Sequence, residues 1–313
     1  MILGRKAALV VCLAAGVIAV PAAEQMQDAL SVLLKAREAL GGEKKLSSIK
    51  TIVAQGETRQ VRGDNLVPIV FEINIELPGK YSRRDETPSI ESGYATSGFS
   101  GDDLIQLPQP VAPVMPQMPA RPGGPPPPTP EQMAAQIAAQ RKTRVATLKQ
   151  DYARLMLGLF ANTTEAFPLT FLRTGIAESP QGKADVIAVT GPNNFKANLL
   201  VNADTHLPVM VSWTPATPTR PGAPGTAGAS RAAGAGSAAA VPPPPGAAPA
   251  NPAPAAPAPP EIRLYFADYR DAGGVMWPHR IRRAVGGETT EETRFDRFKL
   301  NSKIDPKKFE VVK

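Results

Sequence analysis

Two proline-rich segments limit which parts of this chain can fold. Residues 108–130 hold 11 prolines and residues 215–260 hold 14, out of 35 in the 313-residue chain. Sequences rich in alanine, proline and glycine and almost without charge bury too little apolar surface to fold, and they sample extended, polyproline-like states. We therefore predict two disordered insertions at these positions. Without them and the first 22 residues, about 220 residues remain for the fold, the size of one ordinary domain.

The longer segment is expected to interrupt a hairpin and not to separate two domains. Trp213 and Ile262, on either side of it, both belong to patterns typical of strands that would pair with each other. The entropic cost of closing a loop rises slowly with its length, so a hairpin tolerates such an insertion. We predict one domain over residues 23–313.

The first 22 residues are typical of a signal peptide for export. Arg5 and Lys6 precede the uncharged apolar residues 7–19, and small residues follow. A membrane anchor is the alternative, but the apolar stretch is shorter than the roughly 20 residues that a spanning helix needs. We favour cleavage near Ala22 or Ala23, which predicts an exported, periplasmic protein.

The only cysteine lies inside this leader. Cys12 follows Ala8-Leu9-Val10-Val11 and lacks the small residues that precede a lipid-modified cysteine, so lipid attachment there is disfavoured. Once the leader is removed, no thiol remains. Disulfides, zinc–thiolate sites and cysteine nucleophiles are then excluded.

The chain is basic, but its charge pattern does not favour nucleic acid as a partner. The formal charge is +7, and +5 once Arg5 and Lys6 are removed. No aromatic side chains alternate with the basic clusters, so solvated faces or contact with anionic envelope surfaces are favoured instead. The clusters are Arg141-Lys142-Arg144, Arg280-Arg282-Arg283 and Lys303-Lys307-Lys308.

Hydrophobic periodicity predicts a chain of the α+β class. Leucines at helical spacing mark a helix over residues 24–40, and Thr129-Pro130-Glu131-Gln132 has the residues that begin a second long helix. Residues 93–106 are expected to form a glycine-rich bend and a short strand. About nine strands in meander order predict a strongly curved antiparallel sheet, an incomplete β-barrel, wrapped over the helices. The expected strands are 49–59, 67–77, 80–85, 184–190, 195–202, 207–213, 261–269, 276–285 and 289–300.

No residue pattern points to catalysis. The two histidines, His206 and His279, each lie near a proline and lack the carboxylates or second histidine of a metal site. Ser100 lies in Gly98-Phe99-Ser100-Gly101, which lacks the spacing of a nucleophile elbow. We predict that the protein is not an enzyme and has no cofactor and no metal, with a lipid hydrolase using Ser100 as a remote alternative.

Several short motifs resemble those of one family. Together they are similar to the LolA/LolB-like periplasmic lipoprotein-carrier superfamily, the outer-membrane lipoprotein-sorting proteins. The resemblance implies an incomplete antiparallel β-barrel lidded by helices, with an apolar cavity for acyl chains. The two proline-rich segments depart from it, and no strand arginine matches the lid-holding arginine of the family. The motifs are Ala39-Leu40-Gly41-Gly42, residues 77–81 (LPGKY), residues 200–208 (LVNADTHLP), residues 268–279 (DYRDAGGVMWPH) and residues 301–309 (NSKIDPKKF).

We therefore expect a non-catalytic envelope protein that binds a lipid or the acyl chains of a lipoprotein and carries them towards the outer membrane. An envelope interaction or sensing protein with a filled core is the alternative. The expected partners are lipid or lipoprotein acyl chains and an envelope protein, with peripheral membrane contact, no nucleic acid and a monomeric state. The residues expected to line the apolar cavity are Phe71, Ile73, Ile75, Leu199, Val201, Val209, Val211, Leu264 and Phe266.

Overall fold

Twelve antiparallel strands form one sheet in the computed structural model, which describes residues 22–88, 93–108, 129–162, 164–179, 182–215 and 259–311. Residues 1–21 of the predicted leader and most of both proline-rich segments lie outside these ranges. The strands are β1 (Thr51–Arg62), β2 (Asn65–Glu76), β3 (Lys80–Glu86), β4 (Tyr94–Ser100), β5 (Asp103–Leu107), β6 (Thr170–Ser179), β7 (Gly182–Gly191), β8 (Phe195–Asn202), β9 (Pro208–Trp213), β10 (Ile262–Ala272), β11 (Val275–Val285) and β12 (Glu288–Leu300). The helices are α1 (Ala22–Ala39), α2 (Glu43–Ser48), α3 (Pro130–Phe160) and the short 3-10 helix η1 (Pro306–Phe309).

The strand order places the first and last strands side by side. Spatially the sheet runs β5-β4-β3-β2-β1-β12-β11-β10-β9-β8-β7-β6, and β1 pairs with β12 in the middle. The edge strands β5 and β6 do not pair with each other, so the sheet stays open. The chain leaves one edge after β5 and returns at the other edge as β6, and α3 is the element that crosses between them. This confirms the curved antiparallel sheet over helices.

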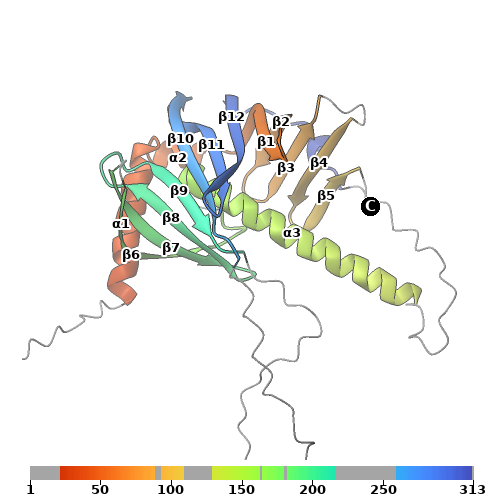
Figure 1. Ribbon diagram of the computed structural model, residues 1–313, viewed down its shortest axis with the longest axis horizontal. Coiled ribbons are helices and arrows are strands. Elements are labelled where there is room, and N and C mark those ends of the chain that lie inside the picture. Colours follow the sequence, from red (N-terminus) through yellow and green to blue (C-terminus); the bar gives the residue numbers. More distant parts are fainter. Residues whose placement is uncertain are drawn as a thin grey trace, which may run out of the picture.

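Helices α1 and α3 cover one face of the sheet in different places. Figure 1 shows α3 crossing the sheet from beyond β5 towards β9, with α1 at the other end beside β6. We call the face under α3 the inner face; it carries Ile52, Ile73 and Phe266, which are all buried. None of the helices in the described ranges is long and apolar enough to cross a membrane.

Local signals explain how α3 begins and ends. Thr129 and Gln132 form a reciprocal capping box, and Pro130 stands at the first helical position. Ala161 ends the helix in the left-handed conformation, with φ of 51°. The side chains are exposed as far as residue 144, and burial begins at Val145, so only the second half of α3 packs on the sheet.

The strand predictions were incomplete at both edges. Residues 94–100 form strand β4 where a glycine-rich bend was predicted, and Gly98 is needed there because a Cβ would lie 2.1 Å from the backbone oxygen of Tyr81. Strand β6 was missed, since an edge strand without a single buried side chain shows little hydrophobic alternation. Helix α2 was also missed.

The longer proline-rich segment joins two strands that pair with each other. Trp213 of β9 lies opposite Ile262 of β10, as predicted. The intervening residues 216–258 lie outside the described ranges, so their predicted disorder stays a prediction. Residues 109–128, between β5 and α3, likewise lie outside.

The C-terminal segment is held against the outer face of the sheet through Glu72. Lys308 donates a hydrogen bond of 2.8 Å to the Glu72 carboxylate, and Gln55 and Asn74 donate to the same group. Burial alone would raise the pKa of Glu72, but these hydrogen bonds and the Lys308 charge outweigh it and lower the pKa to about 2.

We expect Glu72→Gln to lower the free energy of unfolding by about 1 kcal/mol at pH 7, a value kept small because the pair is partly exposed. A carboxyl group whose pKa is depressed in the folded state stabilises the fold above its unfolded pKa. That contribution is lost as the pH falls towards about 2. Urea unfolding of both proteins from pH 7 to pH 2 tests this. The two stabilities should converge in acid, and a gap that stays constant with pH would contradict it.

Candidate functional site

A cavity of about 250 Å³ lies between the second half of α3 and the inner face of the sheet. Strands β2 and β3 from one half of the sheet and β9, β10, β11 and β12 from the other half contribute to it, together with α3. The cavity therefore exists only because α3 crosses from one sheet edge to the other. Its lining residues are Ile73, Tyr81, Arg83, Asp151, Arg154, Leu155, Trp213, Leu264, Ile281, Arg283, Glu291, Thr293 and Phe295.

One part of the lining is hydrocarbon. Strand registry places Ile281 opposite Thr293 and next to Phe266, so it lies on the inner face between β10 and β12. We call the apolar lining residues the apolar floor; they are Ile73, Leu155, Trp213, Leu264, Ile281 and Phe295. Apolar surface of this kind that faces a cavity provides a binding site for hydrocarbon.

The other part of the lining is charged. Three arginines reach the cavity from three separate elements: Arg83 from β3, Arg154 from α3 and Arg283 from β11. Two carboxylates, Asp151 and Glu291, accompany them. We call these five residues the polar wall. Burial raises the pKa of Tyr81 to about 12, so this neighbouring phenol stays neutral at pH 7.

Arg154 is the most deeply buried charge of the polar wall, with only 7% of the residue exposed. Its guanidinium donates hydrogen bonds to Asp151 at 2.7 Å and to Gln150 at 3.3 Å. The group lies 4.2 Å from the centre of the Trp213 ring, a cation–π contact. Burial lowers the pKa of Arg154, while Asp151 opposes that shift; an arginine nonetheless remains charged in a protein.

Arg83 is held firmly by its neighbours on the sheet. It donates to Asp85 at 2.7 Å and to the Thr58 hydroxyl at 3.2 Å, and Thr58 in turn is 2.9 Å from the Thr293 hydroxyl. The guanidinium also lies 4.8 Å from the centre of the Phe71 ring. Arg83 is therefore positioned on the sheet and has its charge balanced by Asp85.

The structure brings only two of the nine predicted lining residues to this cavity, Ile73 and Leu264. Val209 is half-buried in β9. The other six are buried within the packed core. One of them, Phe71, also borders a more polar hollow of about 440 Å³ beside Glu72 and Lys308. The buried ones are Phe71, Ile75, Leu199, Val201, Val211 and Phe266.

The sequence did not mark the three arginines of the polar wall as site residues, and Glu291 was interpreted together with Glu292 as a solvated or ion-paired group. Arg283 was grouped with Arg280 and Arg282 as one basic cluster. Side chains of consecutive strand residues point to opposite faces, and Arg283 faces the cavity while Arg282 lies over the Tyr265 ring on the outer face. The alternation in β11 could have separated them.

The residues considered for catalysis lie apart from the cavity. Ser100 is the last residue of β4. His279 is buried, with its Nδ1 3.0 Å from the Trp277 carbonyl oxygen and its ring against Phe298. His206 lies in the turn between β8 and β9. Within the described ranges, no group of three or more histidine, cysteine or acidic side chains could hold a metal ion.

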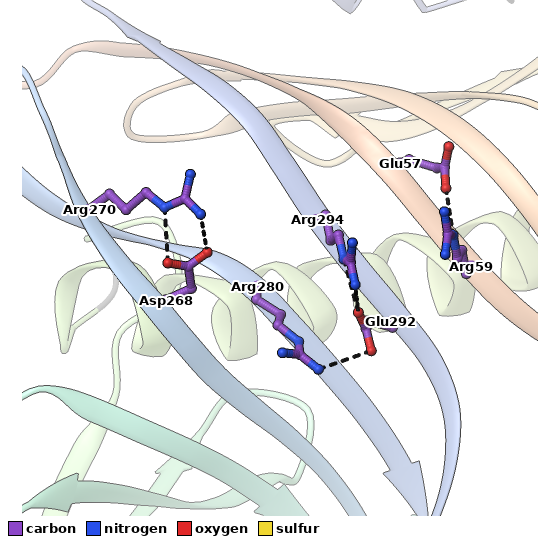
Figure 2. A network of polar contacts seen from close by, with 7 residues as sticks. All are labelled: Glu57, Arg59, Asp268, Arg270, Arg280, Glu292 and Arg294. Carbon is purple, nitrogen blue, oxygen red and sulfur yellow. Dashed lines mark hydrogen bonds and ion pairs between the residues drawn. The ribbon is translucent and has the colours of Figure 1, made fainter.

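The outer face carries a ladder of exposed ion pairs across β1, β12, β11 and β10. Figure 2 shows Glu292 between two arginines, hydrogen bonded to Arg294 at 3.0 Å and to Arg280 at 3.3 Å. Burial would raise the pKa of Glu292, but these two arginines lower it. Asp268 pairs with Arg270 through two hydrogen bonds on the same face. Such exposed pairs stabilise little, so the ladder mainly gives this face a charged, polar surface with four arginines and three carboxylates.

No protein-family model and no curated protein matches the chain. Among solved structures, it is similar to a LolA superfamily protein from Nitrosomonas europaea, with a TM-score of 0.47 and 13% identity over 90% of this chain and 97% of the other. It is also similar to a DUF1329 family protein from Desulfovibrio piger, with a TM-score of 0.46 and 7% identity over 91% and 97% of the two chains. An outer membrane lipoprotein-sorting protein domain from Vibrio parahaemolyticus has a TM-score of 0.44 and 7% identity over 91% and 97%. The first of these structures carries the name of the superfamily that the sequence motifs resemble.

Proposed function

We propose that this protein binds a lipid, or an acyl chain of a lipoprotein, in the cavity under α3, without catalysis. The observation that carries the proposal is the apolar floor, which faces open space although it lies between a helix and a sheet. A signal peptide at residues 1–22 would place this activity in the periplasm. Transport of the bound lipid towards the outer membrane is the role that fits these features best.

The size of the cavity sets what can enter. At about 250 Å³ it is larger than the roughly 150 Å³ apolar cavity that binds benzene in an engineered protein, and slightly below the range of about 300–1,000 Å³ for drug-sized ligands. Each methylene group buried there contributes about 0.8 kcal/mol. A short stretch of acyl chain therefore fits as the cavity stands, and a longer one requires α3 to move away from the sheet.

Filling the cavity is expected to block binding. Leu264→Trp adds bulk on the apolar floor, and displacing two methylene groups of a ligand weakens its binding by about tenfold. The affinity for a fluorescent fatty-acid probe, measured by titration, should therefore fall at least about tenfold. Tyr265→Trp is the matched control, because the neighbouring side chain lies on the outer face.

Circular dichroism and thermal unfolding must show that both variants fold, and Leu155→Trp on α3 provides a second route to the same blockage. Equal affinities in Leu264→Trp and Tyr265→Trp would place the probe elsewhere on the protein.

Two observations favour a second candidate, an envelope interaction or sensing protein with a filled core. Six of the nine residues predicted to line the cavity are packed in the core, and the outer face carries the charged ladder of Figure 2. If the wild-type protein fails to take up the fatty-acid probe or to compete for phospholipid, the second candidate replaces the first.

A further inference from the structure

Two guanidinium groups of the polar wall have buried donors without an acceptor. The Nε atoms of Arg154 and Arg283 are inaccessible to solvent, and neither has a hydrogen-bond partner within the described part of the chain. Arg154 comes from α3 and Arg283 from β11, yet both line the same cavity. Buried donors without acceptors are rare in native proteins, because each loses its water without compensation.

The carboxylates nearby leave these donors free. Asp151 engages a terminal nitrogen of Arg154, and its side chain is 60% exposed at the rim. Glu291 lies 3.8 Å from a terminal nitrogen of Arg283, too far for a hydrogen bond. The third arginine, Arg83, is already paired with Asp85.

The two guanidinium groups also repel each other across the cavity. The charge of Arg283 lowers the pKa of Arg154, in the same direction as burial does. An anion between them would relieve this repulsion and accept hydrogen bonds from the two guanidinium groups. Guanidinium groups suit carboxylate and phosphate oxygens in particular, because charge and planar geometry match.

We propose that the ligand of this cavity is an anionic amphiphile, whose carboxylate or phosphate head is bound between Arg154 and Arg283 while its hydrocarbon lies on the apolar floor. The inference rests on the proposed function, since it assigns the head of the same ligand. It adds a distinction by headgroup: an acyl chain that ends in an uncharged group lacks the acceptors that the two arginines need.

The first test compares ligands of one chain length on the purified full-length protein. Dodecanoate, dodecyl phosphate and dodecanol each compete with a fluorescent fatty-acid probe, and inorganic phosphate is the fourth competitor. Dodecanoate and dodecyl phosphate should bind about 10- to 100-fold more tightly than dodecanol. Inorganic phosphate should compete far more weakly than dodecyl phosphate, because it lacks the chain.

The second test removes one arginine. Arg283→Gln should abolish the preference for the charged heads and leave the affinity for dodecanol within about threefold of wild type. Arg282→Gln, one residue away on the opposite face of β11, should keep the full preference. Arg154→Gln should act like Arg283→Gln. If Arg154→Gln fails to fold because its buried packing on Trp213 is lost, the result for Arg283→Gln decides the test.

The outcomes separate this inference from the proposed function. Equal binding of all three amphiphiles overturns the headgroup site and leaves acyl binding intact. If inorganic phosphate binds as tightly as dodecyl phosphate, the site binds a free anion, and the proposal of an amphiphilic ligand is overturned. A preference that survives in Arg283→Gln also overturns the site, and no binding of any amphiphile to wild type overturns both proposals.

Discussion

Trp277→Ala is expected to lower the free energy of unfolding by about 3–5 kcal/mol. The Trp277 side chain is fully buried, stacks on Phe298 of β12 at 5.2 Å and meets Phe160 of α3 edge-on at 5.3 Å. The indole N–H also donates to the Ala272 carbonyl at 3.3 Å. The residue thus joins the end of α3 to two strands, and alanine would leave a large cavity between them. Urea unfolding followed by circular dichroism measures the loss.

The other tryptophan is the matched control. Trp213 is only half-buried and borders the cavity, so Trp213→Ala should cost less than about 2 kcal/mol. It should, however, weaken binding of the acyl probe, whereas stability should be the main loss in Trp277→Ala. Equal losses of stability in the two variants would contradict the central place of Trp277 in the core.

Gly158→Val is expected to destabilise the protein by about 3 kcal/mol. Gly158 lies on α3 where the helix crosses β10, and a Cβ there would lie 2.1 Å from Cε1 and 2.2 Å from Cζ of Phe266. Tyr269 also indicates the close approach, because its hydroxyl donates to the Pro208 carbonyl at 2.6 Å and lies 3.3 Å from the Gly158 carbonyl. A larger side chain must push the helix away from the sheet. Thermal and urea unfolding both report the effect.

Two further variants separate this clash from simple helix propensity. Ala138→Val places the same residue on the exposed first half of α3 and should cost only about 0.6 kcal/mol. Adding Phe266→Leu to Gly158→Val should cost less than the two single changes together, because the smaller side chain yields space. Full additivity would show that Phe266 is not the neighbour that excludes a side chain at this position.

Much of the local structure could be predicted from the sequence. The beginning of α3 follows from Thr129, Pro130 and Gln132, which act within four residues of each other. The hairpin between β8 and β9 follows from turn residues around Asn202, whose side chain accepts from Asp204 and Thr205. The pairing of β9 with β10 was also predicted, because the strand patterns on both sides of the long insertion were clear.

The candidate site was harder to predict. Its apolar residues resemble any buried strand residue, so Ile73 and Leu264 could be named only together with seven others that do not line the cavity. Arg283 was hidden inside a basic cluster, although the period of two along β11 separates it from its neighbours. Arg154 lies in a long polar helix, where nothing in the spacing marks it as buried.

Local sequence patterns were enough to predict the class of this protein, namely an α+β chain with antiparallel strands in meander order and one well-capped long helix. These features depend on turn chemistry, caps and alternation, which operate over a few residues. Long-range packing sets the pairing of β1 with β12, the path of α3 between the free edges, and the presence of Arg154 and Arg283 in one cavity above an apolar floor. Such contacts join residues more than a hundred positions apart. They depend on packing and burial, because the conformational preferences of a few neighbouring residues do not act over that distance.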